Sequence, residues 1–161
     1  MRRPKTRKPA IQNALTGAAG TYFVAAELSR RGAVVLMTVR NTRGFDLVAS
    51  SSDGNRFATV EVKSSSNRVS YFPASQPSPN PPPSAFYAFV RIAPGDPIGC
   101  PPLKSFEAFI VPASVVLETH YAGGAEGEWA GWSLPASSDE SFLNRWDLIL
   151  DHLGVANQSR P

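Results

Sequence analysis

Three residues in the first half of the chain have types and spacing that could support chemistry: Asp46, Glu61 and Lys63. Glu61 and Lys63 lie two apart in an alternating run, so their side chains share one face of a strand, roughly 6–7 Å apart. The two carboxylates and the backbone carbonyl of Val62 are oxygen ligands of the kind that Mg²⁺ or Mn²⁺ binds. A cation there would activate water and offset charge on a phosphate. Lys63 would hold the water or stabilise the developing anion.

A β-hairpin is expected to bring these three residues together. Its strands are predicted at residues 45–49 and 57–63, joined by a turn at 52–55 in which Gly54 can adopt a positive φ. The tips of the three side chains should then converge on one side of the sheet. Loss of Asp46 should abolish metal binding, because it removes one of the ligands. It can even raise the stability of the protein, because the two carboxylates repel each other when no cation is bound.

The elements before the hairpin must position it. Apolar residues recur at helical spacing over residues 11–31, and Gly32 after two arginines is typical of a helix C-terminus. Gly17 and Gly20 within this helix either allow another element to approach closely or shorten the helix. Residues 33–39 are apolar and β-branched enough for a buried strand.

The second half of the chain completes one domain. Ten of the fifteen prolines fall between residues 73 and 102, so residues from about 73 to 83 should form an exposed loop. Further elements are expected in this order: an antiparallel strand pair at 84–92 and 106–111, helical turns after Pro112, and one helix from the capping box Ser137/Glu140 to Gly154. The three tryptophans, Trp129, Trp132 and Trp146, should pack in the core rather than stack bases. The organisation predicted is a basic flexible tail (1–10), a single domain (11–154) and a polar tail (155–161).

Composition and charge narrow the class of protein. The chain has 161 residues, 42% of them hydrophobic and 18% charged, which is globular. The single cysteine, Cys100, excludes a disulfide framework, and no run is long enough to span a membrane, so a cytoplasmic location is expected. Residues 1–63 hold 11 Lys/Arg against 4 Asp/Glu. This basic half favours a polyanionic partner; the alternative is that the tail of residues 1–10, which holds five of the basic residues, only aids solubility.

The order of motifs over residues 11–65 resembles a known family. The matching residues are Thr16-Gly17-Ala18-Ala19-Gly20, Val24-Ala25-Ala26-Glu27-Leu28, Arg31-Gly32, Gly44-Phe45-Asp46 and Glu61-Val62-Lys63-Ser64. This order resembles the PD-(D/E)XK nuclease superfamily, in particular its small Holliday-junction-resolvase-like and homing- or restriction-endonuclease-like members. The resemblance implies an α/β fold with a restriction-endonuclease-like core, a central mixed β-sheet flanked by helices. It also implies catalysis by Asp46, Glu61 and Lys63, with metal bound by Asp46, Glu61 and Val62.

One position departs from the family pattern, because Thr21 stands where active members often carry a glutamate on the first helix. The function expected is a Mg²⁺-dependent DNA endonuclease that hydrolyses phosphodiester bonds. The alternative, which Thr21 favours, is a catalytically silent nuclease-fold protein that serves as a DNA-binding or assembly subunit. Contacts with DNA phosphates are expected from Arg40, Arg43, Lys5, Arg7 and Lys8. Many small nucleases of this kind are dimers, and the sequence leaves a homodimer open without locating its interface.

Overall fold

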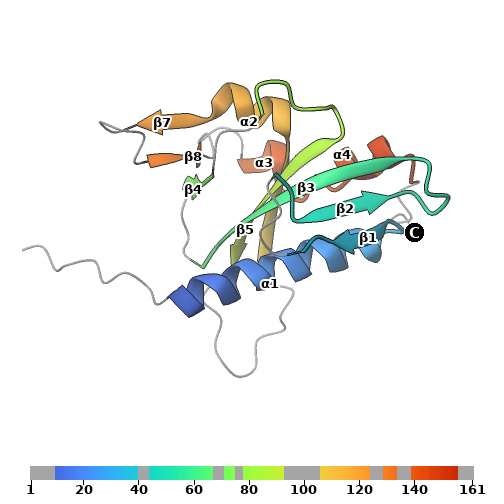
Figure 1. Ribbon diagram of the computed structural model, residues 1–161, viewed down its shortest axis with the longest axis horizontal. Coiled ribbons are helices and arrows are strands. Elements are labelled where there is room, and N and C mark those ends of the chain that lie inside the picture. The colour runs from blue at the N-terminus through green and yellow to red at the C-terminus, as the bar shows by residue number, and fades with distance from the viewer. Residues whose placement is uncertain are drawn as a thin grey trace, which may run out of the picture.

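The computed structural model describes residues 10–39, 44–66, 71–74, 78–92, 106–123, 129–133 and 139–155 (Figure 1). The elements follow one another in this order: α1 (Ala10–Ser29), β1 (Val34–Met37), β2 (Leu47–Ser50), β3 (Phe57–Ser65), β4 (Tyr71–Pro73), β5 (Ala85–Ile92), β6 (Phe106–Pro112), α2 (Ala113–Thr119), β7 (Tyr121–Gly123), β8 (Trp129–Ser133), α3 (Asp139–Phe142) and α4 (Asp147–Leu153).

The central sheet is mixed and has the strand order β1-β2-β3-β5-β6. The first three strands form an antiparallel meander, β3 and β5 run parallel, and β6 returns antiparallel to β5. Parallel neighbours cannot be joined by a tight turn, so the chain leaves the sheet between β3 and β5, where β4 and prolines of the predicted loop lie. The predicted α/β fold with a central mixed sheet is confirmed, as are the β5–β6 pair and the helix after Pro112.

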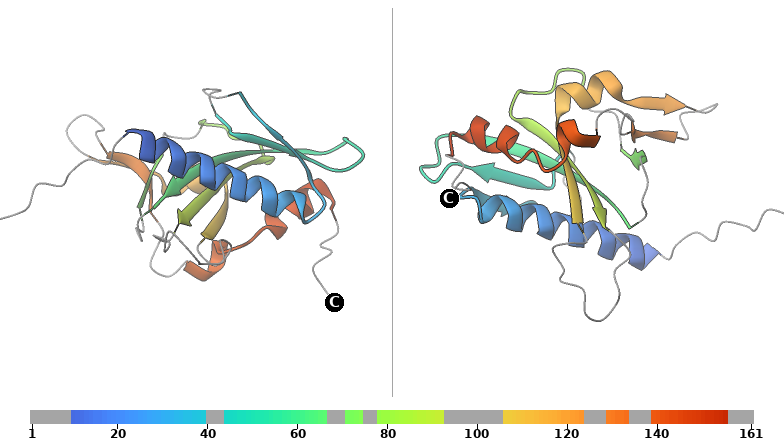
Figure 2. Two further views of the ribbon diagram at one scale, coloured as in Figure 1. Left: turned by 90° about the horizontal axis from the view of Figure 1, so that it is seen from below. Right: turned by 180° about the vertical axis from the view of Figure 1, so that it is seen from behind.

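The two faces of this sheet are covered by different elements (Figure 2). On one face, α1 and α4 pack on alternate residues of β3, β5 and β6, and this makes the larger core. On the other face, α2 and a small sheet of order β4-β8-β7 pack on the outer half, against Phe89 and Phe109. Alternation along β5 therefore supplies both cores, because successive side chains point to opposite faces.

β1 is an exposed edge strand and not the buried strand that the sequence predicted. Leu36 is 61% exposed and Met37 49% exposed, and within β1 only Val35 packs against the larger core. The physical reason is position: in the described part of the chain β1 pairs with β2 alone, and α1 covers one of its faces. Apolar composition could not distinguish an edge strand from a central one.

The helix predicted from Ser137 to Gly154 is broken into α3 and α4. Leu143 makes an isolated antiparallel bridge with Phe109 of β6, and Asn144 adopts a positive φ of 54°. The backbone N–H of Asn144 donates to the carbonyl of Ala108 at 2.7 Å. Leu143 packs against the smaller core whereas Trp146 packs in the larger one, so a single straight helix could not serve both. Gly154 ends α4 with a φ of 67°, as expected, and Ser137 lies outside the described residues.

The small sheet was missed by the sequence analysis. Trp132 of β8 is buried in it, stacks on Phe89 at 4.3 Å between ring centroids and donates from Nε1 to the hydroxyl of Thr119 at 3.0 Å. Trp132 and Trp146 thus have the packing roles expected of them, and the surroundings of the Trp129 side chain are not described. Gly131 in β8 is required because a Cβ there would overlap the carbonyl of Phe72.

Close packing of α1 on β3 fixes the helix over the hairpin. A Cβ at Gly20 would overlap the hydroxyl of Ser64 in β3, whereas a Cβ at Gly17 would meet nothing. Gly20 therefore permits the close approach that the sequence suggested, and Gly17 does not. The residue after Gly20 is Thr21, so this contact also sets the height of Thr21 above the hairpin.

Candidate active site

Glu61 and Lys63 lie on β3 as the alternation predicted. Val60 and Val62 are buried against α1 and α4, so the intervening side chains point to the opposite face. The ammonium of Lys63 forms an ion pair with the carboxylate of Glu61, and both side chains are largely covered. The carboxylate and the lysine that the sequence singled out are thus held next to each other.

Asp46 lies just before β2, at the point where the chain leaves the β3 ladder. Its N–H donates to the carbonyl of Val60 at 2.9 Å, and Leu47 is also opposite Val60. Two residues opposite one is the arrangement of a β-bulge, which re-aims a side chain. The carboxylate oxygen Oδ2 of Asp46 accepts a hydrogen bond from the N–H of Val62 at 2.7 Å. Thr38 holds the Asp46 carbonyl through its own N–H, at 2.9 Å, and through its hydroxyl, at 3.1 Å.

The three predicted residues belong to two separate contacts: Asp46 lines a pocket against α1, whereas Glu61 and Lys63 point to the opposite face of β3. The Asp46 carboxylate reaches the backbone of Val62, which lies between Glu61 and Lys63 in sequence. Across the described chain, no hydrogen bond or ion pair joins Asp46 to either of those two side chains. The predicted convergence of all three tips on one side of the sheet is therefore not found: only Glu61 and Lys63 share a face. The bulge is the reason, because it removes Asp46 from the regular alternation.

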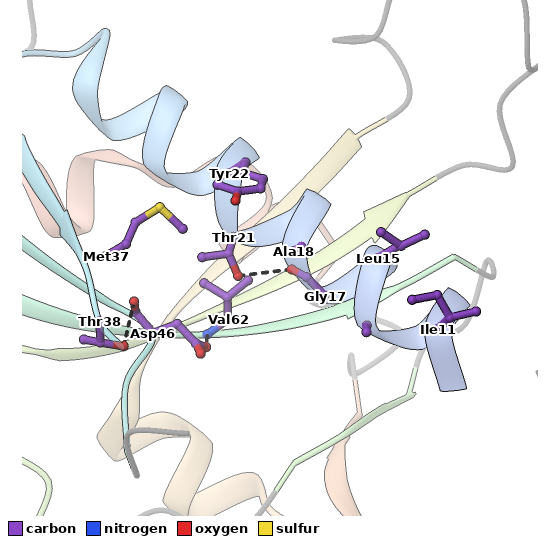
Figure 3. A pocket seen from close by; sticks show the side chains of 11 residues that line it. Ile11, Leu15, Gly17, Ala18, Thr21, Tyr22, Met37, Thr38, Asp46 and Val62 are labelled. Atoms are coloured by element: carbon purple, nitrogen blue, oxygen red, sulfur yellow. Dashed lines mark hydrogen bonds between the residues drawn. The ribbon is translucent and has the colours of Figure 1, made fainter. Parts of the chain in front are cut away.

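A pocket of about 650 Å³ separates Asp46 from α1 (Figure 3). Thr21 lines this pocket together with Asp46 and Val62, so the helix does present position 21 to the hairpin. The Thr21 hydroxyl donates to the carbonyl of Gly17 at 3.1 Å. Its oxygen can accept a hydrogen bond but adds no charge to a cation site.

The acid nearest to Thr21 along α1 serves a different purpose. Glu27 is buried and pairs with both Arg30 and Arg31 at the C-terminal end of the helix. Burial raises the pKa of Glu27, but the hydrogen bonds from Arg30 and Arg31 outweigh it, and the net pKa is lowered. The guanidinium of Arg31 also lies over the ring of Trp146, 5.1 Å from its centroid. Glu27 therefore holds α1 to the core and is no substitute for an acid at position 21.

Other residues at the site were not anticipated from the sequence. Tyr22 and Met37 line the pocket, and Thr38 fixes the backbone of Asp46. Tyr87 on β5 stands opposite Glu61 in the parallel register; burial first, and then the negative charge of Glu61, raise its pKa. The contacts of Thr38 and Tyr87 depend on strand register, which no local pattern contains.

Other expected features have less support. No group of three or more His, Cys, Asp or Glu side chains is placed to hold a metal within the ranges that the structure describes. The five cations expected to contact DNA lie outside those ranges: Arg40, Arg43, Lys5, Arg7 and Lys8. No described helix is both long and apolar enough to cross a bilayer.

Comparison with known proteins agrees with this architecture. No family model and no curated protein sequence matches the chain. Among solved structures, the fold is similar to that of the bacterial homing endonuclease I-Ssp6803I, with a TM-score of 0.52 and 14% sequence identity. The match covers 86% of this chain and 92% of the endonuclease. At this identity the likeness concerns the fold, which is the one that the motifs of residues 11–65 predicted. The chain therefore has a restriction-endonuclease-like fold.

Proposed function

We propose that this protein is a Mg²⁺-dependent DNA endonuclease that hydrolyses phosphodiester bonds. The observation that carries the proposal is the contact between the Asp46 carboxylate and the backbone of Val62, flanked by Glu61 and Lys63 on the same strand. A fold alone supports many activities. The fold together with Asp46, Glu61 and Lys63 at its bulged hairpin supports hydrolysis of phosphodiester bonds.

The candidate ligand atoms are carboxylate and carbonyl oxygens, the type of ligand that hard divalent cations prefer. Oδ2 of Asp46 is engaged by the Val62 N–H, and Oδ1 remains to bind a cation. In a strand the C=O of a residue points to the same edge as its N–H, so the Val62 carbonyl faces the edge that Asp46 occupies. Glu61 supplies the second carboxylate. Bound Mg²⁺ or Mn²⁺ would make water more acidic and offset charge on the phosphate.

The chain's own residues would divide the remaining work. The backbone contacts of Asp46 with Val60, Val62 and Thr38 fix its carboxylate without help from the substrate. Lys63 is held by Glu61, and a cation that takes over Glu61 would release the ammonium toward the phosphate. There it would orient the attacking water and stabilise negative charge as it develops. Tyr87, beside Glu61, would limit how far that carboxylate can turn.

A second candidate function rests on Thr21. At position 21 the pocket presents a hydroxyl instead of an acid, so the site has one carboxylate fewer than active nucleases of this kind often have. In this second candidate the protein is a catalytically silent nuclease-fold subunit that binds DNA or assists assembly. In either case we propose that five basic residues among the first 43 positions contact backbone phosphates: Arg40, Arg43, Lys5, Arg7 and Lys8. Such contacts orient DNA without reading its sequence.

Cleavage by the full chain tests the proposal. Wild type should cut duplex, branched or single-stranded DNA with Mg²⁺ or Mn²⁺ and not with EDTA. Lys63→Ala should abolish cutting while DNA affinity stays within about twofold, because Lys63 acts on the transition state. Arg145→Ala is a matched control, since Arg145 also forms an ion pair with an acid two residues away, far from the hairpin. DNA binding without cutting would support the silent subunit, and wild type that neither binds a cation nor cuts any DNA would end the enzyme proposal.

A further inference from the structure

The pocket beside Asp46 has a wall that the proposed hydrolysis does not use. Its polar end consists of Asp46, Thr38 and Thr21, and its remaining side chains are mostly apolar. Met37 reaches from β1 toward Tyr22 of α1, above Asp46 and Val62 (Figure 3). Tyr22 is 62% exposed and Met37 49% exposed, so this wall faces the opening and not the core. The volume of about 650 Å³ is that of a small-molecule site.

The polar groups of the pocket offer few donors to a ligand. The Thr21 hydroxyl donates to Gly17, and the Thr38 hydroxyl donates to the carbonyls of Phe45 and Asp46. Asp46 is an acceptor when ionised. A ligand held here would therefore be bound by stacking and apolar contact more than by a hydrogen-bond code.

The backbone of a regular duplex does not match this wall, since sugar and phosphate are hydrated and the bases are stacked inside. An unstacked base does match it, because every base has a flat face that packs on an aromatic ring. A protein surface pressed onto the same wall would also cover the Asp46 carboxylate, and burying a charge that has one backbone hydrogen bond and, among the described residues, no counter-ion is costly.

We propose that this pocket holds one unstacked nucleobase next to the scissile phosphate, between the Tyr22 ring and Met37. The preferred substrate class is then DNA with an unpaired nucleotide, such as a bulge, a flap or a branch, with little dependence on which base it is. This inference rests on the proposed function, and it names the substrate of the same site.

Binding can be measured without cation, so that the test does not depend on catalysis. The probes are a labelled duplex and the same duplex with one extra unpaired nucleotide, 2-aminopurine, read by anisotropy and by the fluorescence of that base. Wild type should bind the bulged duplex roughly 5- to 100-fold more tightly than the perfect one, the range expected for one stacked base. Its 2-aminopurine signal should change on binding.

Matched variants separate stacking from general apolar contact. Tyr22→Ala should remove the preference, and Tyr22→Phe should keep it because the ring remains. Phe57→Ala is the control, an aromatic residue 53% exposed and outside the pocket. Met37→Ala should weaken the preference, while Leu36→Ala, on the same strand but pointing away, should not.

The outcomes distinguish this inference from the proposed function. Equal affinity for both duplexes, or an equal loss in Phe57→Ala, would overturn the base pocket even if cleavage is observed. Selective binding without any cleavage would keep the pocket and refute the enzyme. A wild type that sediments as a dimer and becomes monomeric in Tyr22→Ala, with no selective loss of bulge binding, would show a self-interface instead and overturn the proposal.

Discussion

Replacing Asp46 tests the geometry of the site directly. Asp46→Ala removes the acceptor of the Val62 N–H, which lies 2.7 Å from Oδ2. A hydrogen bond to a charged group contributes roughly 1.5–3 kcal/mol. Asp46 is half-buried, so water can partly replace it, and we expect a net loss of about 1–2 kcal/mol. For a chain of this length the melting temperature should fall by about 3–6 °C.

The sign of this effect is opposite to the one that the sequence suggested. Two crowded carboxylates would repel, and removal of one would then raise stability. In the structure Glu61 is paired with Lys63 and Asp46 is held by a backbone N–H, so each charge has its own partner. The loss of a hydrogen bond should therefore exceed any relief of repulsion.

Thermal melts with Mg²⁺ and with EDTA measure both roles of Asp46. Wild type at a Mg²⁺ concentration ten times its Kd should gain about 1.4 kcal/mol, or roughly 3–5 °C. Asp46→Asn keeps an oxygen for the Val62 N–H, so it should lose the Mg²⁺ effect but less stability than Asp46→Ala. Asp151→Asn, an exposed carboxylate on α4, is the control and should change neither quantity.

Two results would refute this reasoning. If Asp46→Ala melts at or above the wild-type temperature in EDTA, the bond to Val62 contributes nothing and charge repulsion dominates. If the Mg²⁺ shift persists in Asp46→Asn, the cation binds elsewhere.

Two further predictions concern α1. Thr21→Glu places a carboxylate in the pocket with Asp46. If the wild-type site is inactive for lack of this acid, the substitution should tighten Mg²⁺ binding about tenfold or more and can restore cleavage; if the wild-type site is active, the cleavage rate should hardly change. An unchanged Mg²⁺ affinity by calorimetry would argue against a cation at Asp46. Glu27→Gln should cost about 3 kcal/mol at pH 7, because it leaves the covered Arg31 without its partner. Since the folded pKa of Glu27 is lowered, its stabilisation is present above the unfolded pKa and is lost as pH falls through the folded value. Denaturant unfolding should thus show a gap in unfolding free energy between wild type and Glu27→Gln that begins to close below the unfolded pKa of about 4.3 and vanishes only below the lowered folded pKa, and a gap independent of pH would contradict the ion pairs.

Local sequence signals were sufficient for the elements that carry the site. Helical spacing located α1, and alternation located β3 and placed Glu61 and Lys63 on one face of it. Glycines that must adopt positive φ were also predictable, since few other residues tolerate that conformation. Gly32 and Gly54 have φ of 96° and 71°.

Local signals failed where an element's role depends on what packs against it. The apolar strand β1 has the composition of a buried strand but lies at the sheet edge, and the C-terminal apolar stripe breaks at Asn144 because β6 takes up its backbone. The short strands of the second sheet have too few residues to show a period, and the sheet is stabilised by packing of Trp132 of β8 on Phe89 of β5, a strand far away in the sequence.

By itself the sequence determined which residues could act: a carboxylate before one strand, a carboxylate and a lysine two apart on the next, and a threonine where the helix could have supplied an acid. Only the tertiary structure decided how they meet. A bulge directs Asp46 to the backbone of Val62, Gly20 allows α1 to hold Thr21 above it, and β5 places Tyr87 beside Glu61. Periodicity is a property of neighbouring residues, whereas bulges, register and helix height are set by contacts between segments 16 to 44 residues apart.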